Sequence, residues 1–529
     1  MNKHQTNYIK DLLLPCLVFS VVTGILSAVL ITLFKLAAQE VISVSGQVYK
    51  LARLEPIGLP ILILGAAAVG LAASFLVKNA KNCRGGGIPT TIAAIRGIAY
   101  FKWIKSVVVL PISALLTFLG GVPLGTEGPC VQMGAAIGDG TVSLLGGKRY
   151  AGWRRYMMTG GAASGFAMVT GAPVTAILFS IEELHRGFSP LVISVVSVSV
   201  LVCHIISRLL SLLGIGTGAM FHLQELEVLP LSELYLPLII GLVCGLGAVA
   251  FTGSYKAVDR FMRHKLGKLS INIKFPIIFA CVALIGYFAS EIMGTGHHLV
   301  QELLSARGVW YALLITLLAR AIIMMISNTS GITGGIFLPT LAFGALMGAL
   351  CGECFVALGI MEQSHYPLMV VLGMVSFLGA SSRIPVTAAV FAMEALGGLS
   401  NLPAMIIAVT VSFFMVEMSG IGDFTDTVIS TKEKHINANK EQYTIEVALT
   451  ATKGSFAVGK ELGDILLPAA CVVLSKEQAA VNEGKHAIGE GDVLTVRYRT
   501  CDPIATAEEL EALVGEQSEE VRSIMRPTK

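Results

Sequence analysis

Long apolar stretches alternate along the chain with stretches that are apolar but interrupted by glycine, proline, serine and threonine. A membrane-spanning helix needs about 20 mostly apolar residues, and the uninterrupted stretches approach or exceed this length. The first of them is too long for the apolar core of a cleavable signal, so we interpret it as a membrane helix. The predicted spans are 12–36, 57–77, 103–121, 190–213, 235–252, 274–293, 309–327 and 402–418.

The interrupted stretches lie at 121–147, 158–184, 328–360 and 373–398. Short apolar segments broken by glycine and proline, in matching places of two halves, are typical of transporters whose site is built from broken helices. The halves of this chain can be aligned directly, because PVTAILFSIEEL at 173–184 and PVTAAVFAMEAL at 385–396 share seven of twelve positions. The sequence therefore predicts an internal duplication, without indicating whether the halves are parallel or inverted. The predicted halves are about 12–215 and 230–420.

Charge divides the chain into a large body and a small tail. Charged residues make up 14% of the chain, against roughly 25% in a soluble domain. Residues 431–529 hold 12 Lys and Arg and 16 Asp and Glu, whereas the other 430 residues hold only 26 and 19. This uneven deficit excludes an ordinary soluble enzyme and a nucleic-acid binder. It predicts a membrane domain over 1–430, a linker over 431–442 and a small soluble domain over 443–515.

The tail has the pattern of a small α+β domain. Residues 443–450 alternate like a strand, 469–474 and 493–499 predict further strands, and helices are expected at 459–468 and 505–514. The predicted fold class is thus an all-α polytopic membrane protein with an internal repeat and broken helices, followed by this α+β domain.

Three glycine-rich stretches stand where helices would begin: GGGIP at 85–89, GTEGP at 125–129 and GGIFLP at 334–339. Proline is tolerated in a first helical turn, and glycine lets the backbone turn tightly. A helix that begins inside a membrane presents unpaired backbone N–H groups and the positive end of its dipole. Several such ends together would bind an anion without Lys or Arg. Close helix packing is the alternative use of these glycines.

Two acidic residues are candidates for function. Glu127 lies within the second stretch, where a charged carboxylate is costly, and it could compete with an anion for the same N–H groups and leave when protonated. Glu182 is repeated as Glu394, which predicts that this glutamate caps structure or packs in the core, whereas Glu183 is not repeated and is the better functional candidate. The alternatives are a loop position for Glu127 and a solvated helix end for Glu183.

Other chemistry is not indicated. The ten cysteines form no disulfide framework, and no cluster of metal ligands or nucleophile–base pair is visible, so we expect no metal, no cofactor and no enzymatic activity. We expect the charged residues Arg320, Glu353 and Arg383 to form structural ion pairs.

In their order and spacing the three stretches resemble the anion-binding motifs of the CLC family of chloride channels and chloride/proton antiporters, usually GSGIP, G(K/R)EGP and GxFxP. The resemblance covers about 10–420, and the segment 171–184 agrees as well. It implies a multi-pass protein of the cell membrane with both termini in the cytoplasm. It also implies a homodimer with a separate pore in each subunit and an inverted repeat within each subunit.

The resemblance implies roles for individual residues. Glu127 matches the external gating and proton glutamate, and Glu183 matches the internal proton glutamate of many antiporters. The backbone N–H groups that would bind the anion belong to Gly86, Gly87, Thr126, Ile336 and Phe337.

Three departures from the family pattern affect these roles. Gly86 stands where the family has a serine, and a lost hydrogen bond to a charged ligand is worth about 1.5–3 kcal/mol. Thr126 replaces the usual basic residue beside the gate. The central tyrosine has no counterpart between Glu394 and Gly420, where 397–401 occupies its region, and this predicts a wider inner gate.

The two glutamates together predict a chloride/proton antiporter whose partners are chloride, protons and the lipid bilayer. A passive chloride channel, an antiporter that prefers nitrate or fluoride, and a sensor with a degenerate pore are the alternatives. The tail resembles the C-terminal regulatory module of RCK (TrkA-C-like) domains, through GKELGD at 459–464 and GEGDVLTV at 489–496. Such modules dimerise and sometimes bind small ligands, so the resemblance implies regulation by an unknown small ligand.

Overall fold

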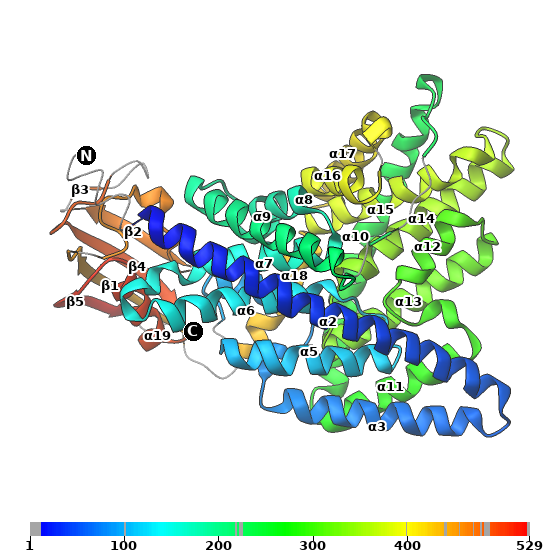
Figure 1. Cartoon of the computed structure of the whole chain (residues 1–529), viewed down its shortest axis with the longest axis horizontal. Coiled ribbons are helices and arrows are strands. Elements are labelled where there is room, and N and C mark those ends of the chain that lie inside the picture. Colours follow the sequence, from blue (N-terminus) through cyan, green and yellow to red (C-terminus); the bar gives the residue numbers. More distant parts are fainter. Residues whose placement is uncertain are drawn as a thin grey trace.

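The computed structural model has a body of packed helices with a small domain of strands at one end (Figure 1). The first residues of α2 and the C-terminal domain lie at that same end. The residues that the structure describes are 12–99, 102–216, 220–221, 226–397, 399–437, 442–453, 455–468, 470–476, 479–480 and 487–525.

The helices fall into two successive sets. In the first half they are α2 (Leu14–Leu54), α3 (Gly58–Lys78), α4 (Gly87–Ile95), α5 (Trp103–Leu119), α6 (Glu127–Leu145), α7 (Arg154–Thr170), α8 (Pro173–Phe179) and α9 (Pro190–Leu212). In the second half they are α10 (Tyr235–Leu266), α11 (Ile271–Phe288), α12 (His297–Ser305), α13 (Trp310–Ser330), α14 (Phe337–Ala357), α15 (Tyr366–Ser382), α16 (Pro385–Ala395) and α17 (Leu402–Ser419). The helix α18 (Phe424–Asn437) follows and leads toward the tail.

Within the described residues, nine helices are long and apolar enough to cross a membrane. Seven of the eight predicted spans are among them, whereas 103–121 forms α5, a shorter apolar helix of 17 residues. The other two, α14 and α15, lie in the interrupted stretches and were not predicted as spans. Their glycines serve close packing, because a Cβ on Gly344 of α14 would come 2.4 Å from the Gly373 carbonyl oxygen of α15.

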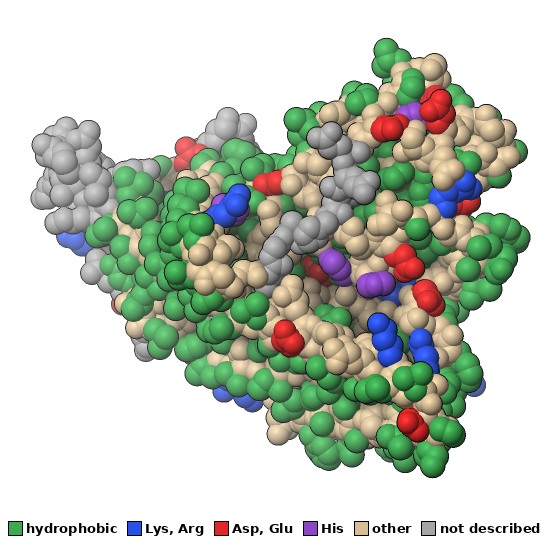
Figure 2. All heavy atoms as spheres, turned by 45° about the vertical axis from the view of Figure 1, so that its right-hand side comes forward, with side chains coloured by type: hydrophobic (Ala, Val, Ile, Leu, Met, Phe, Trp, Pro, Cys, Tyr) green, Lys and Arg blue, Asp and Glu red, His purple; other side chains and the backbone are tan. Residues whose placement is uncertain are grey.

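The outer flanks of the body are apolar. Figure 2 shows many hydrophobic side chains along these flanks, while some of the charged and histidine side chains surround a hollow in the same face. Large exposed apolar side chains on α2, α3, α9 and α13 are suited to contact lipid tails, which remove the usual cost of exposing apolar surface to water. Examples are Leu33, Ile61, Phe75, Leu201 and Ile322.

The two halves contact each other reciprocally. The Glu182 carboxylate accepts the backbone N–H groups of Val386 and Thr387, at 3.2 and 2.6 Å, at the start of α16. In return, the Glu394 carboxylate accepts those of Val174 and Thr175, at 3.0 and 2.8 Å, at the start of α8. The predicted capping role of the repeated glutamate is confirmed, and the exchange is what a pseudo-two-fold axis between the halves produces.

The tail is an antiparallel five-stranded sheet in the order β3-β2-β4-β1-β5 with one helix, α19 (Pro503–Leu513). Three strands and the last helix agree with prediction. The predicted helix at 459–468 is wrong, since only the short turn Leu462–Asp464 is helical, and β5 was not predicted at all. The strands are β1 (Tyr443–Thr450), β2 (Cys471–Lys476), β3 (Ala479–Ala480), β4 (Val493–Thr500) and β5 (Gln517–Met525).

The tail packs on the start of α7. The Phe456 ring lies 5.4 Å from the ring of Trp153 and 5.3 Å from that of Tyr156. Arg155 forms an ion pair with Glu509 at 2.5 Å. These contacts join the tail firmly to the body at one helix.

Candidate functional site

Three helices begin at the same place in the middle of the body. The helices α4, α6 and α14 each have proline as their third residue, where a missing N–H is no loss. Gly125 and Gly335, in the loops before α6 and α14, exchange two backbone hydrogen bonds of 2.8 and 2.7 Å. The five residues predicted to offer anion-binding N–H groups all lie at the caps or first positions of these helices: Gly86, Gly87, Thr126, Ile336 and Phe337.

Only glycine permits this convergence. A Cβ on Gly87 would come 1.9 Å from the Gly128 carbonyl oxygen, and a Cβ on Gly128 would come 2.7 Å from the Gly335 Cα atom. Such distances are far inside van der Waals contact, so the helix ends meet because no side chains separate them. The prediction of converging helix N-termini is confirmed, and their binding of an anion stays a prediction.

Glu127 is fully buried at this convergence. Its carboxylate accepts a hydrogen bond from the Thr126 hydroxyl at 3.2 Å and one from the Leu338 N–H at 3.4 Å. The second donor belongs to the first turn of α14. The carboxylate thus lies where an anion bound to that helix end would lie, and the alternative of an external loop position is wrong.

A cation near Glu127 was missed by the sequence analysis. Lys35 of α2 interacts electrostatically with Glu127, and its ammonium donates to the Met168 carbonyl oxygen at 2.7 Å. It is the only charged residue in the first predicted span, which is the signal that could have found it. Lys35 brings positive charge from another helix to the surroundings of Glu127, where Thr126 supplies none.

Glu183 lies at the other side of the same region, in the π-helical turn Ser180–His185. It is 2% exposed, so the alternative of a solvated helix end is wrong. An internal cavity is lined by Glu183 and by the residues at the start of α14, Ile336 and Phe337. The structure therefore brings Glu183 to one space with two of the five predicted anion ligands, Ile336 and Phe337.

The inner end of this cavity corrects one expectation. Phe424 and Thr425, at the start of α18, line the cavity, and Thr425 interacts with the Glu183 carboxylate. Asn401, at the end of the segment that was expected in this region, lies elsewhere, because it bonds to Glu227 and Leu229. Phe424 follows Gly420 and so lies outside the range between Glu394 and Gly420 to which the expectation was confined.

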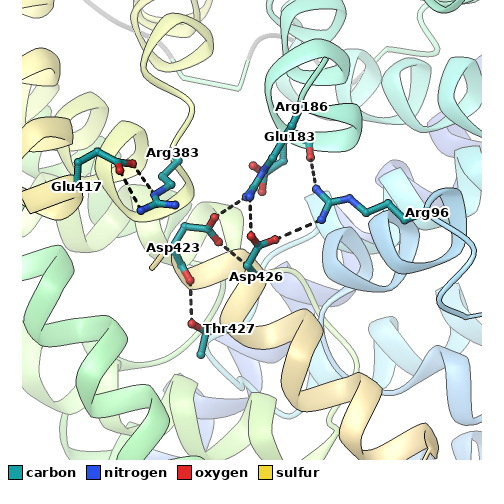
Figure 3. A network of polar contacts seen from close by, with 8 residues as sticks. All are labelled: Arg96, Glu183, Arg186, Arg383, Glu417, Asp423, Asp426 and Thr427. Carbon is teal, nitrogen blue, oxygen red and sulfur yellow. Dashed lines mark hydrogen bonds and ion pairs between the residues drawn. The ribbon is translucent and has the colours of Figure 1, made fainter. Parts of the chain in front are cut away.

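Ion pairs hold the turn of Glu183 against α18 (Figure 3). Arg186 bridges Asp423 and Asp426, each at 2.5 Å. Arg96 pairs with Asp426 at 3.4 Å and donates to the Glu183 backbone carbonyl at 3.5 Å. The network fixes the backbone on both sides of the cavity, and Arg186 also interacts electrostatically with the Glu183 carboxylate.

The other charged residues singled out in the sequence are structural. Glu353 pairs with Arg307 at 2.6 Å and Arg383 with Glu417 at 2.7 Å, as predicted. Arg320 does not form the predicted ion pair; its guanidinium donates to three backbone carbonyls, those of Glu291, Met293 and Gly294. These hydrogen bonds provide donors for buried backbone carbonyls that water cannot reach.

Comparison with known proteins agrees with this architecture. The chain is 27% identical to the H(+)/Cl(-) exchange transporter ClcA of Klebsiella pneumoniae (strain 342) over 375 residues, which cover 70% of this chain and 78% of the relative. It is 27% identical to the protein of the same name from Citrobacter koseri, over 73% of this chain and 82% of the relative.

Solved structures share the fold. A slow cyanobacterial Cl-/H+ antiporter superposes with a TM-score of 0.72 at 23% identity, over 80% of this chain and 99% of that one. A CLC-type fluoride/proton antiporter superposes with a TM-score of 0.64 at 19% identity, over 78% of this chain and 98% of that one.

A profile of the voltage gated chloride channel family matches residues 68–417, which contain all three glycine-rich stretches and both candidate glutamates. With the matching fold and the three convergent helix ends, this places the chain in the CLC family of membrane proteins.

Proposed function

We propose that this chain exchanges chloride for protons across the membrane. The observation that carries the proposal is the position of the Glu127 carboxylate at the start of α14, among the N–H groups that an anion would use. Glu183, across the cavity from these groups, supports it further. The relatives named as H(+)/Cl(-) exchange transporters support the same substrates.

In the proposed mechanism the anion is held by backbone dipoles. The first turns of α4, α6 and α14 offer N–H groups and partial positive charge, which bind an anion without the strong attraction of a full cation. An ionised Glu127 occupies this site, and on protonation it leaves and lets chloride enter. Glu183 passes protons between the cytoplasm and Glu127. One proton-carrying group thus blocks the path of the anion, and this couples the two movements.

The test uses the purified chain in liposomes loaded with chloride. As chloride leaves the vesicles down its gradient, the wild-type protein should move protons into them, as measured with a pH-sensitive dye. In Glu127→Gln the side chain keeps its size but cannot ionise, so proton movement should fall to background while chloride efflux persists. Chloride efflux without proton movement in the wild type would leave the passive channel, and unchanged coupling in the variant would remove Glu127 from the mechanism.

Anion preference is the second open part of the function. Gly86 has no hydroxyl to offer, and this favours testing nitrate and fluoride in the same vesicles beside chloride. Faster proton-coupled exchange with either anion than with chloride would make that anion the substrate.

We also propose that the chain forms a homodimer with both termini in the cytoplasm and that the tail, as an RCK-C-like module, regulates transport. The common location of the start of α2 and the tail supports a shared side for the termini.

A further inference from the structure

A side chain from outside the sequence motifs borders the place of the missing serine. A Cβ atom on Gly86 would lie 3.4 Å from the Nδ2 atom of Asn328 and 3.7 Å from the Cγ2 atom of Ile336. Asn328 belongs to the last turn of α13, whereas Gly86 caps α4. The carboxamide therefore lies next to the space that a serine hydroxyl would occupy, beside a predicted anion ligand.

The amide nitrogen is buried and has no acceptor. Asn328 is 5% exposed, and within the described part of the chain its Nδ2 atom makes no hydrogen bond. Its Oδ1 atom, in contrast, accepts a hydrogen bond of 2.8 Å from the Tyr255 hydroxyl. A buried donor without an acceptor is rare in a folded protein, and a bound water or ion is one source of the missing partner. A donor of this kind suits an anion.

Tyr255 holds the amide in this orientation. Its ring is 1% exposed and packs edge-on against the ring of Phe424 at 5.0 Å. Because the phenol hydroxyl donates to Oδ1, the two N–H groups of the carboxamide point away from Tyr255. A negative ion near Nδ2 favours the same orientation, since the opposite one would present the carbonyl oxygen to it.

A lysine supports the neighbouring backbone. The Lys432 ammonium of α18 donates to the Arg84 carbonyl at 3.0 Å, to the Gly86 carbonyl at 2.9 Å and to the Thr90 hydroxyl. All three acceptors belong to the segment that leads into α4 or to its first turn. In a trans peptide the carbonyl and the following N–H point in opposite directions, so Lys432 keeps the Gly86 oxygen turned away from the Gly87 N–H.

We propose that Asn328, oriented by Tyr255, is the side-chain ligand of the central anion and replaces the serine that Gly86 lacks. The inference rests on the proposed function for the presence of a transported anion at this site. It adds a specificity-determining residue, because a carboxamide donates two N–H groups and differs from a hydroxyl in reach and direction.

The experiment measures chloride binding to the purified full chain in detergent by isothermal titration calorimetry. Asn328→Leu keeps the approximate size but removes the donor, and chloride should bind roughly ten-fold more weakly. Adding Gly86→Ser to that variant returns a hydroxyl to the site and should recover most of the affinity. Asn401→Leu is the matched control, since it removes another buried asparagine, which bonds to Glu227 and Leu229, and should leave the affinity unchanged.

Unchanged chloride affinity in Asn328→Leu, or a loss that Gly86→Ser does not restore, would overturn the assignment. If Asn328→Leu does not fold, Asn328→Asp replaces the amide with a carboxylate of the same shape. Chloride binding should then fall below detection, and binding at the wild-type affinity would overturn the assignment. These binding measurements are separate from the transport test. A wild-type chain that binds chloride but moves no protons would refute the proposed exchange. The assignment of Asn328 would still be decided by the chloride affinities of its variants.

Discussion

The two candidate glutamates are buried in a region that holds few charged side chains. Glu183 and Glu127 are both buried, yet neither is neutralised by an ion pair among the described contacts. A carboxylate in such a place is costly unless it exchanges a proton, which is the use that coupled transport makes of it.

Glu183→Gln tests the inner residue. Glutamine fills the same volume against the cavity but cannot carry a proton, so proton movement in liposomes should fall to background. Chloride affinity, measured on the same preparation, should stay within about two-fold of wild type, because the proposed anion ligands on α4 and α14 are untouched. Proton-coupled exchange at the wild-type rate would show that protons reach Glu127 by another route.

The sequence patterns predicted the candidate residues that lie inside a motif or a repeat. They missed residues that reach the site only because distant helices pack together. Glu127 lies inside a recognisable motif, and the failure of Glu183 to repeat set it apart from Glu182. Asn328 and Lys35 come from helices distant in the sequence, and only packing brings them to the site. A lone polar residue at a helix end carries no signal that distinguishes it from an ordinary cap.

At the scale of elements, the site depends on the absence of side chains where three helices begin. The glycine and proline pattern predicted these helix starts, because it reports backbone geometry that few other residues allow. The same pattern was misleading for α14 and α15, since glycines that break a helix and glycines that let two helices touch look alike in one sequence. The edge strand β5 was missed because its polar sequence has no alternation, and its pairing with β1 decides its structure.

Gly128→Ala should separate the helix ends. The added methyl group would overlap the backbone at Gly335, and such overpacking costs typically 1–3 kcal/mol of stability. Chloride binding, measured by calorimetry, should weaken at least about ten-fold, since 1.4 kcal/mol corresponds to a factor of ten.

Gly65→Ala is the control for this variant. Position 65 lies inside α3 with open space around it, so the same substitution should leave binding intact and slightly raise the thermal midpoint. Equal chloride affinity in Gly128→Ala and Gly65→Ala would refute the dependence of the site on this close approach.

At the scale of the whole molecule, the tail is attached at the first turn of α7. Phe456→Ala removes the ring that packs on Trp153 and Tyr156, and loss of a buried aromatic side chain typically costs about 3–5 kcal/mol. Hydrogen exchange followed by mass spectrometry should show faster exchange across the tail strands and at the start of α7, with the rest of the body unchanged.

Val472→Ala is the matched control in the tail. This side chain is 58% exposed on β2, away from the Phe456 contact, and its shortening should leave exchange at α7 as in wild type. Identical exchange in Phe456→Ala and Val472→Ala would mean that the aromatic contact does not attach the tail.

The helix α7 joins the tail to the surroundings of Glu127. The helix has 17 residues. Near its start Arg155 pairs with Glu509 of the tail, and roughly 20 Å further along the helix the Met168 carbonyl accepts a hydrogen bond from Lys35, which lies near Glu127. Because an α-helix is rigid along its axis, a small movement of the tail along the axis of α7 would move Met168 by a similar distance. A change in the position of the tail would therefore also change the surroundings of Glu127.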